Sequence, residues 1–183
     1  IIGHGKSIHT RKGDGIDKMS AWIYDIMEGE GIGKIHIVGV SLGAVLAQDL
    51  ANRYPDRVSS LACFGGYDIN NFDVKMQKEN GASQMRMMLK GLFSIKWFAE
   101  SNKKISAFTP RAQNDFYEMN IQFPKRSFMY FASLNHMENR YQTGQRAYPL
   151  LIGCGEFDIP AELEVIKQWK AREPQCKVVF FEN

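Results

Sequence analysis

Two glycines on either side of a serine form the segment of this chain that is best suited to covalent chemistry. Gly39, Ser41 and Gly43 make a G-x-S-x-G pentapeptide. A serine hydroxyl attacks a carbonyl group only when a base can take its proton, so the side chain has to stand clear of the fold on a sharp turn. We expect both glycines to make room for that turn, because side chains there would collide with the neighbouring strand and helix. The pentapeptide therefore predicts Ser41 as a nucleophile for acyl transfer.

The residues around the pentapeptide fit a strand that turns sharply into a helix. Residues 35–40 form a short apolar run, typical of a strand buried on both faces of a parallel sheet. After the turn, apolar residues recur at helical spacing until Pro55 stops the helix. Leu42 would present its backbone N–H at the first turn of that helix, where it can donate to a developing oxyanion. The competing interpretation is an ordinary strand–glycine–helix turn with an incidental serine.

Strand and helix patterns alternate along much of the chain. This alternation predicts an α/β fold with a parallel sheet and helices on both faces. We expect strands at residues 35–40, 58–64, 150–154 and 177–181, and helices at about 16–27, 42–54 and 160–173. Reactive groups in such sheets gather beyond the carboxyl ends of the strands, where Ser41 and Asp158 both fall.

Three further motifs occur in the order found in the α/β-hydrolase superfamily, which the sequence resembles. Residues 3–7 (GHGKS) look like the turn after the family's fourth strand, and residues 52–58 (NRYPDRV) look like its connection to the sixth strand. Residues 148–158 (YPLLIGCGEFD) look like the seventh strand and the loop that carries an acid. The resemblance implies an α/β-hydrolase core, with residues 1–68 as its first part, 69–147 as an inserted helical lid and 148–183 as its second part.

The expected lid segment is rich in flexible and aromatic apolar residues. It holds seven of the nine methionines and eight of the twelve phenylalanines. These residues could line a hydrophobic pocket, or they could form the core that a small helical subdomain needs. The same two interpretations apply to the helically spaced stripe of Met85, Met88, Leu89 and Leu92. The segment also has 12 Lys plus Arg against 6 Asp plus Glu, which could steer anionic substrates or a membrane surface, or only form a solvated face.

The resemblance implies a catalytic triad in which Ser41 is the nucleophile and Asp158 is the acid. A carboxylate in that place orients the catalytic imidazole and stabilises its cation. Asp158 could instead be a favourable charge at the start of a helix. Asp68 is the second candidate, because some members of the family carry the acid after the sixth strand.

The family places the catalytic histidine after the last strand, and no histidine follows Asp158. The four histidines present are His4, which we expect to be structural, His36 in a strand, and His9 and His136 in loops or in the lid. We therefore expect the base and the second oxyanion donor to lie outside the chain, which would be truncated at both ends. The alternative is a degenerate, inactive copy.

The activity that the resemblance implies is that of a serine hydrolase, esterase- or lipase-like, which cleaves a carboxylic ester or related acyl bond through an acyl-enzyme intermediate. No metal or organic cofactor is implied, and the expected partner is a small, partly hydrophobic ester. A C–C bond hydrolase, a lyase, a haloperoxidase-like enzyme and a ligand-binding protein without turnover are the alternatives on the same fold.

Composition agrees with a globular protein and gives no sign of nucleic-acid binding. The chain has 183 residues, 44% of them apolar, and a net charge of +3. No run of 18 apolar residues is present, so we expect no transmembrane helix. Cys63, Cys154 and Cys176 lack the spacing of metal ligands and are expected to be reduced, buried thiols, which favours a cytoplasmic protein.

Overall fold

The computed structural model divides the chain into two compact units. It describes residues 1–7, 13–71, 86–87, 89–138, 140–141, 145–158 and 160–182. One unit, called here the helical unit, comprises Ile1–Ile16 and Asp73–Ser133. The other, called the sheet unit, comprises Asp17–Phe72 and Leu134–Asn183.

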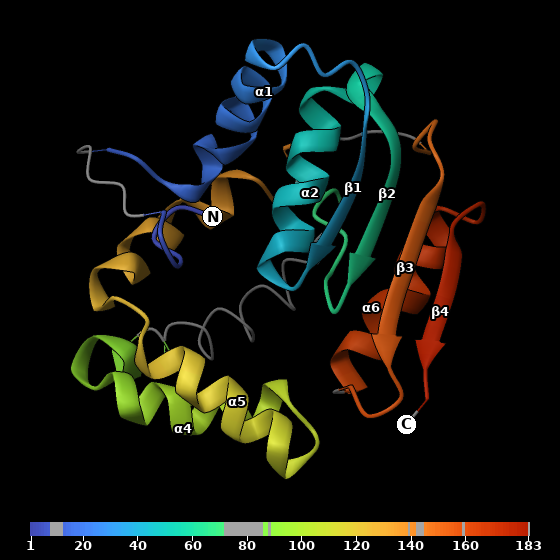
Figure 1. Ribbon diagram of the computed structural model, residues 1–183. Helices are drawn as coiled ribbons and strands as arrows, with labels where there is room; N and C mark the ends of the chain where they lie inside the picture. Colours follow the sequence, from blue (N-terminus) through green and yellow to red (C-terminus); the bar gives the residue numbers. More distant parts are fainter. Residues whose placement is uncertain are drawn as a thin grey trace. The chain divides into compact units, whose positions relative to one another are not determined.

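The sheet unit is built on parallel strands whose order in space follows their order in sequence. They are β1 (Ile35–Val40), β2 (Val58–Phe64), β3 (Leu150–Gly155) and β4 (Lys177–Phe181). Each neighbouring pair is parallel, and the arrows in Figure 1 point the same way. Strands form where the sequence predicted them because each is an apolar run bounded by turn or helix residues. All four carboxyl ends therefore lie at one edge of the sheet.

Helices α2 (Leu42–Arg53) and α6 (Pro160–Arg172) bury one face of this sheet. Their side chains and those of the strands form a single core. Its buried members are Ala44, Ala47, Ala51, Val58, Leu61, Cys63, Tyr148, Leu150, Ile152, Cys154, Ile166, Trp169 and Cys176. Helix α1 (Met19–Gly29), preceded by a 3-10 turn at Ile16–Lys18, packs on α2 rather than on a strand. A second 3-10 turn, Pro55–Arg57, leads from α2 into β2.

The opposite face of the sheet is exposed at β1 among the described residues. Alternate residues of a strand point to opposite faces, so Val38 and Val40 share the face that α2 does not cover. Val38 is 69% exposed and Val40 is 65% exposed. The prediction of helices on both faces is thus met on one face within the described part of the chain.

The helical unit contains α4 (Ile95–Ser106) and α5 (Pro110–Ile121), which pack against each other, and most of the 3-10 segment η3 (Lys125–His136). Both α-helices begin at a capping hydroxyl. Ser94 accepts a hydrogen bond from the backbone N–H of Trp97, and Thr109 accepts one from Ala112. Such caps satisfy amide groups that the first turn of a helix leaves without a partner.

An aromatic cluster forms the interior of the helical unit. Phe128 contacts Phe98, Phe123 and Phe131, with ring centroids 4.9 to 6.2 Å apart. His4 packs edge-on against Phe123 at 5.0 Å, and its Nδ1 lies 3.1 Å from the carbonyl oxygen of Ile2. His4 is therefore structural, as predicted, and much of the phenylalanine content of this segment serves its own core.

The predicted apolar stripe in this segment is not part of that core where it is described. Leu89 and Leu92 are both exposed. Met85 and Met88 lie outside the described residues, as does His9. Spacing alone could not separate core from surface here, because a helical stripe faces whatever its neighbours place beside it.

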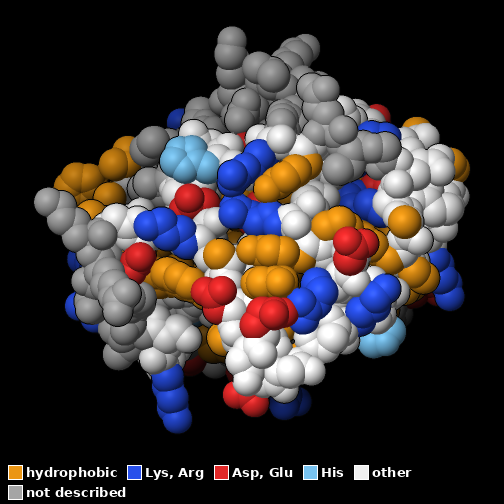
Figure 2. All heavy atoms as spheres, turned by 90° about the horizontal axis from the view of Figure 1, so that it is seen from above, with side chains coloured by type: hydrophobic (Ala, Val, Ile, Leu, Met, Phe, Trp, Pro, Cys, Tyr) orange, Lys and Arg blue, Asp and Glu red, His pale blue; other side chains and the backbone are white. Residues whose placement is uncertain are grey.

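Acidic and basic side chains are interspersed on the face shown in Figure 2, in keeping with the small net charge of +3. Over the described residues, no helix combines the length and the apolarity required to span a bilayer.

Strand β1 and helix α2 come into backbone contact at Gly39. A Cβ atom at this position would lie 2.5 Å from the carbonyl carbon of Gly43 and 2.6 Å from the Cα of Ala44. A Cβ atom at Gly43 would meet nothing within 4 Å. The expectation that both glycines make room is right for Gly39 and wrong for Gly43, because Gly43 makes the close approach with its backbone.

The two glycines allow a matched test. We expect Gly39→Ala to lower the free energy of unfolding by about 1–3 kcal/mol, since overpacking against a backbone forces the helix to shift. Gly43→Ala should be neutral or stabilising by up to about 1 kcal/mol, because alanine favours a helix over glycine. Urea denaturation followed by circular dichroism measures both. Equal losses in the two variants would contradict this packing.

Valines on the two faces of the sheet allow a second test. Val58 is 5% exposed and Val38 is 69% exposed. We expect Val58→Ala to lower the free energy of unfolding by about 2 kcal/mol, the loss of two buried methyl groups. Val38→Ala should change it by less than about 0.5 kcal/mol, as surface substitutions do. If Val38→Ala had the larger effect in the same denaturation assay, the assignment of faces would be wrong.

Candidate active site

Ser41 sits at the point where β1 turns into α2, in a backbone conformation that side chains rarely adopt. Its φ is 52° and its ψ is −120°. Among the described residues it is the one non-glycine residue with a positive φ. Its backbone N–H donates to the carbonyl oxygen of Phe64 at 2.9 Å, and its own carbonyl oxygen accepts from Ala44 at 2.8 Å. These bonds hold the turn from both sides, and the residue is exposed.

Leu42 is the first residue of α2. Within a helix each N–H bonds to the carbonyl four residues earlier, so the N–H of a first residue has no such partner. The amide of Leu42 therefore belongs to the positive end of the helix, directly after the serine. If Ser41 attacked a carbonyl carbon, the negative charge that develops on the carbonyl oxygen would lie close to this group.

The segment that leaves β2 passes beside the strand-to-helix turn at residues 39–43, called here the elbow. The sequence reasoning missed this feature. Gly65 has a φ of 54° and donates its N–H to the carbonyl oxygen of Gly153 at 3.0 Å. A Cβ atom at Gly66 would lie 2.8 Å from the Cβ of Ala44 and 3.8 Å from the carbonyl oxygen of Ser41. The pair of glycines directly after a predicted strand was the available signal, because only glycine fits such an approach.

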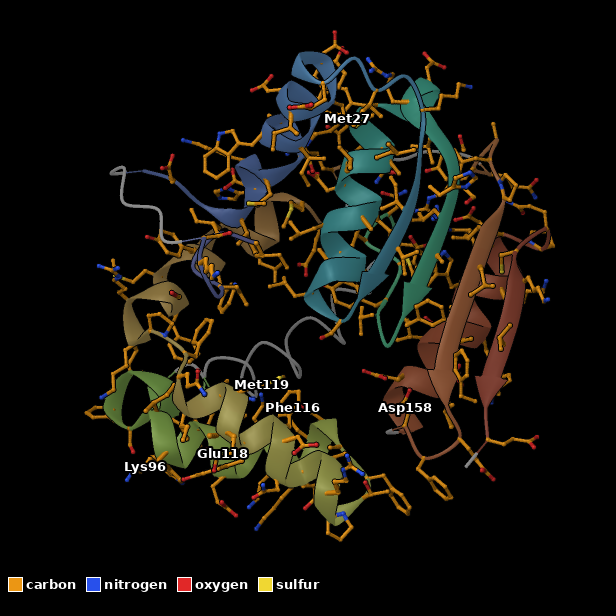
Figure 3. The ribbon with its side chains drawn as sticks, viewed as in Figure 1. Met27, Lys96, Phe116, Glu118, Met119 and Asp158 are labelled. Atoms are coloured by element: carbon orange, nitrogen blue, oxygen red, sulfur yellow. The ribbon has the colours of Figure 1, made fainter. Side chains whose placement is uncertain are left out.

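Asp158 lies in the loop between β3 and α6, at the end of the sheet where the strands finish (Figure 3). Its Oδ2 accepts a hydrogen bond from the backbone N–H of Gly155 at 2.8 Å. Its own N–H donates to the carbonyl oxygen of Gly155 at 3.2 Å. This pair of bonds fixes the half-buried carboxylate at the carboxyl edge of the sheet.

One strand separates Ser41 from Asp158. Val40 pairs with Phe64 on β2, and Phe64 pairs with Gly153 on β3. Neighbouring strands lie about 4.8 Å apart, so the ends of β1 and β3 are roughly 10 Å from each other. A gap of that size leaves room for an imidazole ring between the two side chains. The structure thus brings Ser41 and Asp158 to the same edge.

Asp68, the second candidate for the acid, is buried and already paired. Its Oδ1 lies 3.6 Å from an Nη of Arg146, and its Oδ2 lies 2.5 Å from an Nη of Arg172. Its Oδ1 also accepts from the backbone N–H of Asn70 at 3.0 Å. Two guanidinium groups and an amide therefore compete with any imidazole for this carboxylate.

The two described histidines of the sheet unit are engaged elsewhere. His36 lies 2.7 Å from the hydroxyl of Ser60. It precedes Ser41 by five residues of extended chain, which is about 16 Å. His136 is exposed, 3.8 Å from a carboxylate oxygen of Asp17.

The three thiols are buried, as the sequence predicted. Burial raises the pKa of Cys63 to about 12. Burial also raises the pKa of Cys176, and that of Cys154 with help from the nearby carboxylates of Asp158 and Glu162. A thiol with a raised pKa stays protonated at neutral pH and is a poor nucleophile. Among the described side chains, no group of three or more His, Cys, Asp or Glu residues is placed to hold a metal ion.

Comparison with known proteins agrees with this arrangement. The model of a family described as having the alpha/beta hydrolase fold matches residues 1–183. A carboxylesterase of Nitrososphaera gargenis superposes with a TM-score of 0.77 at 17% identity, over 99% of this chain and 68% of that protein. An esterase from Thermogutta terrifontis gives a TM-score of 0.80 at 20% identity, over 98% of this chain and 68% of that one.

A putative non-heme bromoperoxidase from Mycobacterium tuberculosis is also similar. It gives a TM-score of 0.70 at 19% identity, over 98% of this chain and 69% of that protein. Identities in this range carry the fold and leave the chemistry open. The match of the family model over the whole chain, together with the parallel sheet and the elbow at Ser41, shows that this chain belongs to the α/β-hydrolase fold family.

Proposed function

We propose that the protein is a serine hydrolase that cleaves a carboxylic ester or a related acyl bond through an acyl-enzyme intermediate. The backbone of Ser41 carries the proposal. A non-glycine residue whose backbone is held at φ 52° on an exposed strand-to-helix turn is strained, and such strain concentrates at functional sites. Position 41 carries the hydroxyl that acyl transfer requires, at the edge of the sheet where active sites of α/β proteins form.

The chemistry assigns one role to each group at this edge. The oxygen of Ser41 forms a bond to the acyl carbon while an imidazole takes its proton, and the imidazole then passes that proton to the departing alcohol. The N–H of Leu42 stabilises the oxyanion. Asp158 orients the imidazole and stabilises its cation. The described residues supply no histidine bound to Asp158, so the base in this proposal is a histidine outside that set.

Two observations favour Asp158 over Asp68 as the acid. Asp158 is half-buried at the edge of the sheet and is held by Gly155 alone among the interactions described, while both oxygens of Asp68 face guanidinium groups. In the second half of the reaction, water attacks the acyl carbon of the acyl-enzyme while the imidazole takes a proton from that water. The imidazole then returns the proton to the oxygen of Ser41, and the carboxylic acid departs. The mechanism needs neither metal nor organic cofactor.

Carboxylic esters are the proposed substrates because esterases stand among the similar structures. A haloperoxidase-like activity is the second candidate, favoured by the similar bromoperoxidase.

We also propose that residues 69–147 form a lid on a core made of 1–68 and 148–183. The division into units supports an inserted helical segment, because Asp73–Ser133 lies in one unit and the flanking Asp17–Phe72 and Leu134–Asn183 lie in the other. Ile1–Ile16 belongs to the helical unit in this division. The buried thiols favour a cytoplasmic protein.

The nucleophile can be tested directly in the intact protein. We expect a fluorophosphonate to label Ser41 covalently, because the reagent captures an activated serine hydroxyl. Ser41→Ala should abolish labelling and lower ester turnover by about 10⁴-fold or more. Ser106→Ala, at an exposed serine on α4, is the control and should change neither. Labelling detected by intact mass in Ser41→Ala would remove Ser41 from this role.

The acid can be tested in the same assay. Asp158→Asn keeps the shape of the side chain and removes its charge, so turnover should fall by about 10⁴-fold. Glu156→Gln, at an exposed carboxylate in the same loop, is the control and should keep most of the activity. Asp68→Asn is not a suitable control, because it would break the buried pairs with Arg146 and Arg172. A similar small loss in Asp158→Asn and Glu156→Gln would rule Asp158 out as the acid.

A further inference from the structure

The sheet unit contains a closed ring of four charges that the proposed chemistry does not use. This charge ring consists of Asp68, Arg146, Glu173 and Arg172. Arg146 pairs with Glu173 and lies 3.6 Å from Asp68. Arg172 lies 2.5 Å from Asp68 and 3.4 Å from Glu173. The side chains of Arg146, Asp68 and Glu173 are only 2%, 4% and 0% exposed, and that of Arg172 is 24% exposed. The ring is therefore a neutral, alternating set of charges that is largely buried in the unit.

Gln48 joins the charge ring to helix α2. This buried side chain uses its full hydrogen-bonding capacity. Its Nε2 donates to the carbonyl oxygens of Ala44 at 3.2 Å and Tyr67 at 2.7 Å. Its Oε1 accepts from the N–H of Ile69 and from an Nη of Arg146, each at 3.2 Å. The helix that begins at the nucleophile is thus fastened to the ring through one amide group.

Glu173 joins the other side of the charge ring to helix α6. It follows directly after the helix, and its Oε1 accepts from the indole N–H of Trp169 at 3.2 Å. Its Oε2 accepts from the backbone N–H of Arg146 at 3.2 Å. Helix α6 starts at Pro160, two residues after Asp158. A continuous path of helices and buried polar contacts therefore runs from the nucleophile to the acid.

The same contacts join the segment that leaves β2 to the segment that returns to β3. Tyr67 donates its hydroxyl to Glu138 at 2.6 Å, and Asp68 pairs with Arg146. Both ends of the long connection between the two strands are thereby held against the sheet unit. A change at Arg146 would loosen this junction as well as the link to α2.

Buried charges require a fixed geometry in a way that apolar contacts do not. Two helices in contact through methyl groups can slide, whereas a guanidinium fork held by carboxylates and an amide loses its compensation when it moves. We propose that Arg146 is a positioning residue, which sets the separation of α2 and α6 and thereby that of Ser41 and Asp158. The catalytic part of this inference rests on the proposed function; the coupling of the two helices does not.

Arg146→Lys in the intact protein tests the inference. Lysine keeps the charge but offers one nitrogen, which does not reproduce the planar fork to Gln48, Glu173 and Asp68. We expect faster amide hydrogen exchange both at residues 42–45 and at residues 155–158. We also expect fluorophosphonate labelling to slow by about 10- to 100-fold, and ester turnover to fall in kcat with KM unchanged, as misplaced catalytic groups produce. Arg140→Lys, at an exposed arginine in the same connection, should alter none of these.

The outcomes separate this inference from the proposed function. If the unaltered protein takes up no fluorophosphonate, the proposed function fails, and hydrogen exchange alone still decides whether Arg146 couples the two helices. Faster exchange confined to the neighbourhood of residue 146, with unchanged exchange at residues 42–45 and 155–158, would overturn the inference. If Arg146→Lys does not fold, Gln48→Met decides. It removes the link to α2 without altering charge, and unchanged exchange at residues 155–158 would then reject the coupling.

Discussion

The close backbone contact between β1 and α2 is the constraint on which the rest of the site depends. The backbone of Ser41 is held at a positive φ, which costs free energy in a residue with a side chain. Such a conformation persists only where several surrounding contacts fix it. The absence of a Cβ at Gly39 lets the helix approach, and the bond from Ser41 to Phe64 ties the turn to the next strand. Ser41 is therefore positioned by glycine and by backbone amides and carbonyls.

From this contact the remaining geometry follows by the rules of a parallel sheet. Strands β1, β2 and β3 end at one edge, so a turn after the first and a loop after the third come to face the same space. The buried polar network behind the sheet then links the helices that start from that turn and that loop. Apolar burial stabilises the unit, and the directional polar contacts fix the position of one helix relative to the other.

Local patterns predicted the strands and helices of the sheet unit closely, because each is a short apolar run or a helical stripe with clear ends. The elbow at Ser41 and the position of Asp158 could be predicted for the same reason. The role of Gly43 was misjudged, since a motif does not say whether a glycine is needed for its missing side chain or for its backbone. The charge ring and its link to α2 were not foreseen, because Arg146 lies 27 residues from Glu173 and 98 residues from Gln48, and spacing carries no information across such distances.

The conformation of the turn at position 41 depends on its neighbours and not on the side-chain hydroxyl. The contacts that set the angles at position 41 come from Gly39, Phe64 and Ala44, and none involves the hydroxyl. A thiol or a carboxylate of similar size could occupy the same place with little change in the surrounding fold. The same fold would therefore accept different reactive groups at position 41. A substitution at this one position would alter the chemistry while the architecture stays the same.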